Sequence, residues 1–124
     1  MVNTIEVSEK GGIVVIMVKR MRNIAAIDKR KIKIVSDLCN MAESNNVVKR
    51  IIIFGSTASK TCLDSSDIDI CYDISCDTRD KRARELSVLT SKICDHNCDI
   101  VYYDLIGSNL KHEIDTKGVV VYES

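Results

Sequence analysis

The feature that most restricts the fold is a run of β-favouring residues that stops at a glycine. Residues 47–54 are Val-Val-Lys-Arg-Ile-Ile-Ile-Phe, and Gly55-Ser56 follows directly. A strand rich in β-branched residues, without regular polar alternation, is typical of the buried centre of a sheet. The pattern therefore predicts a central strand over residues 47–54 that ends in a short loop at Gly55-Ser56.

A second strand with a different pattern follows this loop. Residues 67–72 are Asp-Ile-Asp-Ile-Cys-Tyr. Because successive side chains of a strand point to opposite faces, the two isoleucines should share one face and the aspartates, Asp67 and Asp69, the other. The sequence therefore predicts two carboxylates that point in the same direction.

The other periodic segments complete an α/β (α+β) domain in which helices flank a small mixed sheet. Their spacing predicts helices over residues 27–44, 79–95 and 105–116, and strands over residues 99–103 and 119–122. Within the second helix we expect Asp77 or Thr78 to cap the N-terminus, and an apolar stripe to face the core through Ala83, Leu86, Leu89 and Ile93. Residues 4–7 and 13–18, on either side of a Glu-Lys-Gly-Gly turn, predict a β-hairpin extension.

Composition favours one ordinary soluble domain over residues 1–124, with an extension over 1–26 and a core over 28–124. The chain is 45% hydrophobic and 29% charged, and eighteen basic residues balance eighteen acidic ones. A neutral chain has no overall field to attract long nucleic acid, which makes that partner unlikely. No apolar run approaches the roughly 18 residues of a membrane span, and no secretory signal is evident. We therefore expect a cytoplasmic protein.

Six cysteines stand at positions 39, 62, 71, 76, 94 and 98. In a chain without a secretory signal they are expected to be reduced thiols rather than a disulfide framework. Cys94 and Cys98, on either side of His96, could reach a metal ion, but no second pair stands at a zinc-site spacing. We expect Cys94 to be a core residue at a helix end and Cys98 to open a strand.

The residue types around the predicted loop suit phosphate and metal chemistry. A Gly-Ser pair between a strand and a short helix exposes backbone N–H groups and a hydroxyl, which together can hold an anion. Aspartates at i and i+2 present oxygen ligands to one volume, as magnesium bound to a triphosphate requires. Asp99 opens another predicted strand and can supply a third carboxylate. Asp95, Asp104 and Asp115 are the alternatives to it in that part of the chain.

The motif Ile53-Phe54-Gly55-Ser56, then Asp67-Ile68-Asp69 and Asp99-Ile100-Val101, resembles the nucleotidyltransferase superfamily that includes DNA polymerase beta. It is most similar to the minimal nucleotidyltransferases (MNT) that pair with small helical HEPN proteins in toxin–antitoxin modules. The likeness covers roughly residues 28–124. It implies the polymerase beta-like fold, with Gly55 and Ser56 holding the triphosphate of ATP or another NTP. Asp67, Asp69 and Asp99 are implied as catalytic residues that ligate two Mg²⁺ ions, with Asp99 also helping to deprotonate the acceptor hydroxyl.

The loop departs from this family pattern after Gly-Ser. Members commonly carry an arginine and, two or three residues later, a glycine, whereas this chain has Thr57-Ala58-Ser59-Lys60. Lys60 could narrow the phosphate loop, or its ammonium could contact a phosphate as a point charge. The departure bears on activity more than on the fold.

The resemblance implies transfer of a nucleoside monophosphate, most simply AMP from ATP, to a hydroxyl on a protein or RNA. A short chain leaves the acceptor site to a partner, either a HEPN-type protein or a second copy, and a tyrosine on the HEPN toxin is the implied acceptor. The alternative is an antitoxin with weak or absent catalysis that neutralises its partner by contact alone.

Overall fold

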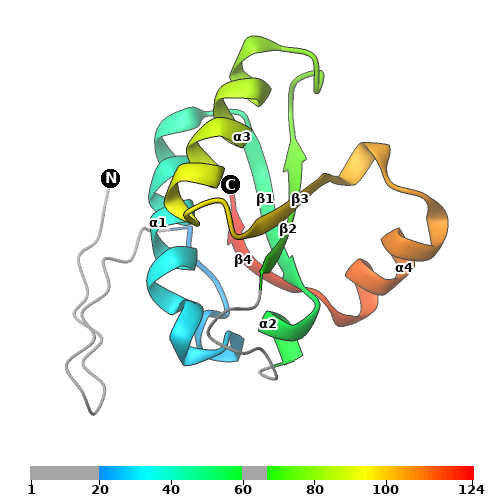
Figure 1. Ribbon diagram of the computed structural model, residues 1–124. Helices are drawn as coiled ribbons and strands as arrows, with labels where there is room; N and C mark the ends of the chain where they lie inside the picture. The colour runs from blue at the N-terminus through cyan, green and yellow to red at the C-terminus, as the bar shows by residue number, and fades with distance from the viewer. Residues whose placement is uncertain (1–19, 60–66) are drawn as a thin grey trace.

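The computed structural model describes residues 20–59 and 67–124, and its centre is a four-stranded mixed sheet in the order β3-β2-β1-β4 (Figure 1). The strands are β1 (Val48–Phe54), β2 (Ile68–Ile74), β3 (Cys98–Tyr102) and β4 (Val119–Glu123). β1 is antiparallel to both of its neighbours, whereas β2 and β3 are parallel. The predicted mixed sheet is confirmed. The expected hairpin over 4–18 lies outside the described residues.

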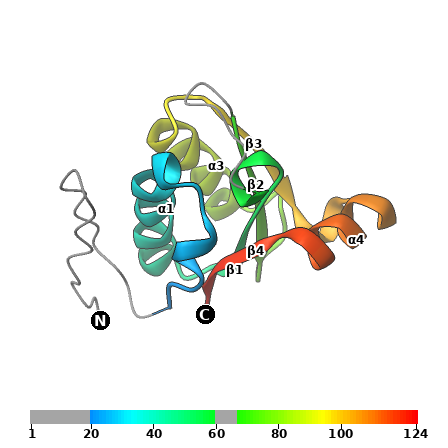
Figure 2. The ribbon, with the colours of Figure 1, turned by 90° about the horizontal axis from the view of Figure 1, so that it is seen from below.

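Helices cover both faces of this sheet (Figure 2). One face is covered by α1 (Ile32–Asn45) and α3 (Lys81–Ile93), and the other by α4 (Ser108–Lys117). The short α2 (Ser56–Ser59) follows β1, and 3₁₀ turns at Ile24–Ala26, Lys29–Lys31 and Tyr103–Leu105 (η1, η2 and η3) connect the larger elements. No helix within residues 20–59 and 67–124 has the length and apolar content of a transmembrane span.

The main core lies between the sheet and the α1–α3 layer. Inward residues of the strands, such as Ile53, Ile68 and Ile70, are fully buried there, as are Val35 and Leu38 of α1. A smaller apolar cluster under α4 is formed by Ile52, Phe54, Cys71 and Ile114. Because side chains alternate along the strands, β2 and β3 also have a face that points away from α1 and α3. Polar residues lie at one end of that face, and α4 covers the other end.

Two details of α3 differ from the prediction. Asp80, rather than Asp77 or Thr78, is the N-cap, and its side chain accepts a hydrogen bond from the backbone N–H of Arg82. Leu89 is 42% exposed, so its expected place in the core is wrong. Thr90 takes the buried position instead, because its hydroxyl is bound on both sides: it donates to the carbonyl of Leu86 and meets the hydroxyl of buried Tyr72.

Gly118 ends α4, as predicted, for a reason other than backbone conformation. Its φ of −71° is open to any residue, and its N–H binds the carbonyl of Ile114. A Cβ at this position would lie 2.6 Å from Ile52 Cγ2 and 2.5 Å from the Ile114 carbonyl oxygen. Such distances are far inside van der Waals contact, so glycine is needed for the close approach of α4 to β1.

The Tyr72–Thr90 contact predicts unequal effects of two substitutions. Because the Thr90 hydroxyl already donates to Leu86, Tyr72 must be the donor of their mutual bond. Tyr72→Phe removes one bond and should lower the free energy of unfolding by about 1 kcal/mol. Thr90→Val leaves a buried donor unpaired and should cost more, about 1–3 kcal/mol. Urea unfolding followed by circular dichroism measures both, and a smaller loss for Thr90→Val would contradict this assignment.

Candidate active site

The predicted site residues gather at one edge of the sheet. The C-terminal end of antiparallel β1 and the N-terminal ends of parallel β2 and β3 meet there. In the sheet register Phe54 pairs with Asp69, and Asp69 pairs with Asp99. The first strand thus delivers Gly55 to the place where the other two strands present their carboxylates.

Asp69 and Asp99 form a close carboxyl pair. Direct pairing in register places their side chains on the same face of neighbouring strands. The charge of Asp99 therefore acts directly on the Asp69 carboxyl group. Burial of Asp69 raises its pKa, and the charge and hydrogen bond of Asp99 raise it further, followed by the charges of Asp67 and Glu113. Like charges held this close favour a shared proton or a bound cation.

Asp67 lies just before β2 and is exposed. Its charge acts on Asp69, so it belongs to the same electrostatic cluster. However, no group of three or more Asp, Glu, His or Cys side chains within the described ranges is arranged to hold a metal ion. The structure thus brings Asp69 and Asp99 together and leaves Asp67 at the rim.

This arrangement fits magnesium bound together with a triphosphate. Mg²⁺ is commonly held by one or two carboxylates plus phosphate oxygens and water, rather than by a cage of protein ligands alone. The Asp69–Asp99 pair supplies two hard oxygen donors whose mutual repulsion a cation would relieve. Asp67 would have to turn inward to become a third ligand. The donor set therefore suits the ion, although it is not fully assembled.

Gly55 brings the backbone directly against the carboxylates. Its φ of 71° lies in the left-handed region, and a Cβ added there would collide with Oδ2 of Asp69. The left-handed conformation requires glycine, and a Cβ would in addition displace the Asp69 carboxylate. Ser56 then begins α2 and is half buried. Lys60, the expected phosphate contact, lies outside the described residues.

Thr57 is a structural residue rather than part of the phosphate surface. It is fully buried, and its carbonyl accepts a hydrogen bond from the backbone N–H of Asp28 at 3.3 Å. Its hydroxyl has no hydrogen-bond partner among the described residues. Thr57, where the family commonly carries arginine, therefore faces inward and contributes no group to the phosphate surface.

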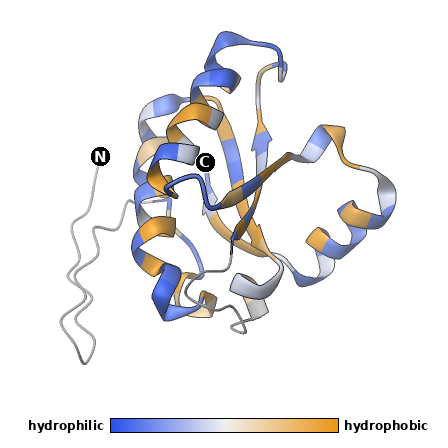
Figure 3. Ribbon diagram, in the orientation of Figure 1, coloured by the Kyte–Doolittle hydropathy of each residue, from blue (hydrophilic) through white to orange (hydrophobic). Residues whose placement is uncertain are grey.

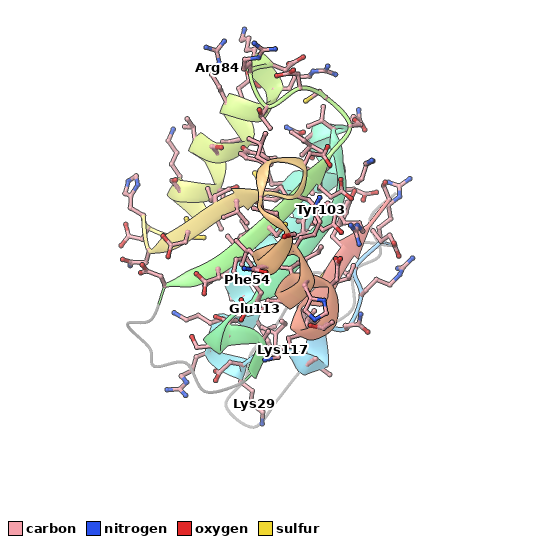
Figure 4. All side chains as sticks on the ribbon, turned by 90° about the vertical axis from the view of Figure 1, so that its right-hand side faces the viewer. Lys29, Phe54, Arg84, Tyr103, Glu113 and Lys117 are labelled. Atoms are coloured by element: carbon pink, nitrogen blue, oxygen red, sulfur yellow. The ribbon has the colours of Figure 1, made fainter. Side chains whose placement is uncertain are left out.

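Glu113 is the site neighbour that sequence reasoning missed. It lies on α4 beside Phe54, whose strand partner is Asp69 (Figure 4). Its position depends on the docking of α4, where Tyr103 lies between the Arg50 guanidinium and the Lys111 ammonium, 4.9 and 4.6 Å from the ring centre. The Tyr103 hydroxyl also donates to Asp115 at 2.8 Å. In the sequence, the only hint of the position of Glu113 is that it directly precedes Ile114, an apolar residue of the predicted helix that proves to be buried.

The cysteines and the alternative acids lie outside the Asp69–Asp99 pair. Cys94 is buried at the C-terminal end of α3, and Cys98 begins β3, as expected. Of the alternative acids, Asp115 accepts a hydrogen bond from Tyr103, whereas Asp95 and Asp104 are exposed and are not among the charges that raise the pKa of Asp69. Asp99 is thus the acid that the fold places beside Asp69.

Comparison with solved structures finds the same fold in toxin–antitoxin complexes of the MNT type. A toxin–antitoxin structure with AMP-PNP aligns with a TM-score of 0.60 and 26% identity, covering 73% of each chain. A chain of the complex between a tri-AMPylated Shewanella oneidensis HEPN toxin and an MNT antitoxin aligns with a TM-score of 0.55 and 22% identity. The alignment covers 73% of this chain and 71% of the other. An MntA–HepT complex aligns at 0.54 and 24%, with the same two coverages.

No curated protein matches the chain significantly. Residues 36–124 match the family described as polymerase beta, nucleotidyltransferase, and this range contains the whole sheet and the carboxylate pair. The chain therefore belongs to the polymerase beta-like nucleotidyltransferase family.

Proposed function

We propose that this protein is a metal-dependent nucleotidyltransferase that transfers AMP from ATP to a hydroxyl on a protein partner, as the antitoxin of a HEPN-type toxin. The observation that carries the proposal is the in-register Asp69–Asp99 pair beside the backbone of Gly55. The AMP-PNP complex and the tri-AMPylated toxin among the structural neighbours support the choice of nucleotide and acceptor class. Such a reaction, with ATP as donor, suits the cytoplasm.

Different residues would bind the nucleotide and the metal ions. The N–H groups and hydroxyl of Gly55-Ser56 would bind the triphosphate, with Lys60 as a further phosphate contact. Asp69 and Asp99 would hold magnesium, and Asp67 would join them when the triphosphate is present. Bound Mg²⁺ supplies charge neutralisation at the transferring phosphoryl group and lowers the pKa of the acceptor hydroxyl.

The transfer replaces a phosphoanhydride bond of ATP with a phosphate ester to the acceptor. The acceptor oxygen forms a bond to the α-phosphorus as the bond from that phosphorus to the pyrophosphate oxygen breaks. The acceptor proton moves to Asp99, which lies at the exposed end of the pair. Pyrophosphate leaves, and the acceptor keeps AMP.

One observation favours the alternative of an antitoxin that acts by contact alone. The described part of the chain has no preassembled group of three metal-binding side chains. The two functions differ in the fate of labelled ATP: transfer leaves α-phosphate label on the partner, whereas contact alone does not. In cells expressing the toxin, Asp67→Asn should abolish protection under the first function and preserve it under the second.

Asp69→Asn should have opposite effects on binding and on stability. Loss of a ligand should weaken magnesium-dependent ATP binding at least about tenfold, as measured by calorimetry. Asp104→Asn, which changes an exposed acid outside the cluster, is the matched control. Unchanged binding by Asp69→Asn would contradict the proposed site.

The stability effect follows from the raised pKa of Asp69. A carboxyl whose pKa is higher in the folded state binds its proton more tightly there, so folding stability falls as pH rises from about 4 through the folded pKa. Without metal, Asp69→Asn should therefore melt at a higher temperature than wild type at pH 7, and the difference should disappear near pH 3. Added Mg-ATP should reverse the order, because wild type binds it more tightly than the variant does. Thermal melts at both pH values test this.

Gly55→Ala should damage both fold and site. The left-handed backbone and the collision with Asp69 predict a loss of at least about 1 kcal/mol of stability and weaker Mg-ATP binding. Gly107→Ala is the control, because a Cβ there meets no atom within 4 Å. Denaturant unfolding and calorimetry measure the two effects. Equal behaviour of the two variants would rule out a special role for Gly55.

A further inference from the structure

α3 exposes two large apolar residues on the side that faces away from the sheet. Val88 is 54% exposed and Leu89 is 42% exposed. Leu89 is outside because Thr90 occupies the buried position through its hydroxyl contacts with Tyr72 and Leu86. Hydrophobic colouring shows the same pattern, with apolar residues in the middle of α3 and hydrophilic ones at its N-terminal end (Figure 3). The core of this domain does not use these two side chains.

Basic residues flank this apolar centre along the helix. Lys81 and Arg84 precede it and Lys92 follows it, at spacings that place all three on the outward stripe. The side chains of these three form no ion pair or hydrogen bond within the described ranges, although the charge of Arg84 acts on Asp80. Arg82, in contrast, pairs with Asp80 at 3.1 Å. Arg84 projects from the molecule, far from Glu113 and Phe54 (Figure 4). Glu85 is the one acid among the charged residues of α3.

Shallow grooves adjoin the two apolar residues. One, of about 460 Å³, is lined by Lys81, Arg84, Glu85, Val88 and Leu89. Another, of about 420 Å³, continues from Glu85 and Leu89 to Met41 of α1. The surface formed by Lys81, Arg84, Val88, Leu89, Lys92 and Met41 is here called the α3 surface. It is apolar at Val88, Leu89 and Met41 and basic at both ends, and Glu85 is the acid that lines both grooves.

We propose that the α3 surface is the docking site for a protein partner that presents a helix with an apolar centre and acidic ends. Acidic ends would pair with the unpaired cations, and apolar side chains would cover Val88, Leu89 and Met41. Charge complementarity selects this occupant. A nucleic acid would gain nothing from the exposed valine and leucine at the centre. The clustered acids of a second copy lie in its own active site and not at the ends of an apolar helix face.

The direction of α3 connects this surface with the candidate active site. α3 runs toward the edge where β3 begins, so Lys92 near its C-terminal end is separated from Asp99 by one short turn of chain (Figure 1). The carboxylates lie on the sheet face opposite to α3, so a partner docked on α3 reaches them by wrapping around this edge. That the docked protein also supplies the acceptor hydroxyl rests on the proposed function, but the docking itself does not.

Two synthetic helical peptides test the docking. Both carry leucines along one face; one has glutamates at its ends and the other lysines. Titrated into the ¹⁵N-labelled full chain, the glutamate peptide should shift amide resonances of residues 81–93 and the lysine peptide should not. Val88→Glu should weaken binding of the glutamate peptide at least about tenfold. Leu105→Glu, at a residue 68% exposed on η3, is the matched control and should bind normally.

Four results would overturn the proposal. The first is that neither peptide binds, or both bind equally. The second is that the shifts lie away from α3. The third is that a uridine dodecamer shifts the same resonances more strongly than the glutamate peptide. The fourth is that the protein alone self-associates and Val88→Glu abolishes this. Calorimetry of Mg-ATP on the same sample judges the proposed function separately, so either idea can fail without the other.

Discussion

The structure must accommodate the repulsion between two carboxylates, because the parallel register of β2 and β3 places Asp69 directly beside Asp99. Two carboxylates this close repel each other when both are charged, and partial burial of Asp69 increases the cost, as its raised pKa reflects. The sheet must therefore be stable enough elsewhere to hold them. The fully buried Ile68 and Ile70 on the opposite face of β2, with the partly buried Ile100 of β3, pack on the α1–α3 side and supply that stability. The strand alternation thus assigns one face to folding and the other to chemistry.

The second constraint is geometric and involves the end of β1. Antiparallel pairing with β2 delivers Gly55 to Asp69, and its left-handed backbone favours glycine, whose missing Cβ leaves room for the Asp69 carboxylate. The same pairing places the start of α2, with Ser56, at the carboxylate edge. α4 closes the other face through Ile114 and the Tyr103 stack, which sets Glu113 next to the site. Anion-binding backbone and cation-binding side chains are therefore neighbours because of sheet topology.

Local pattern in the sequence was sufficient for the sheet and for the carboxylate pair. The alternation around Ile68 and Ile70 fixed the direction of Asp69, and Asp99 follows from a strand that must lie beside it. Leu89, Thr90 and Glu113 could not be placed in this way. A threonine displaces a leucine from the core only because a tyrosine hydroxyl from another strand meets it, and Glu113 approaches Asp69 only through the docking of α4. Both depend on contacts between segments distant in sequence.

We propose that the Asp69–Asp99 pair holds a divalent cation with a nucleotide at the Gly55 edge. A crystal of the protein soaked with Mn²⁺ and a non-hydrolysable ATP analogue, measured for anomalous scattering, tests this. We expect a manganese peak in contact with both carboxylates, with the triphosphate against the backbone of Gly55-Ser56. A bound nucleotide without a peak at this pair, or a peak held by other residues, would contradict it.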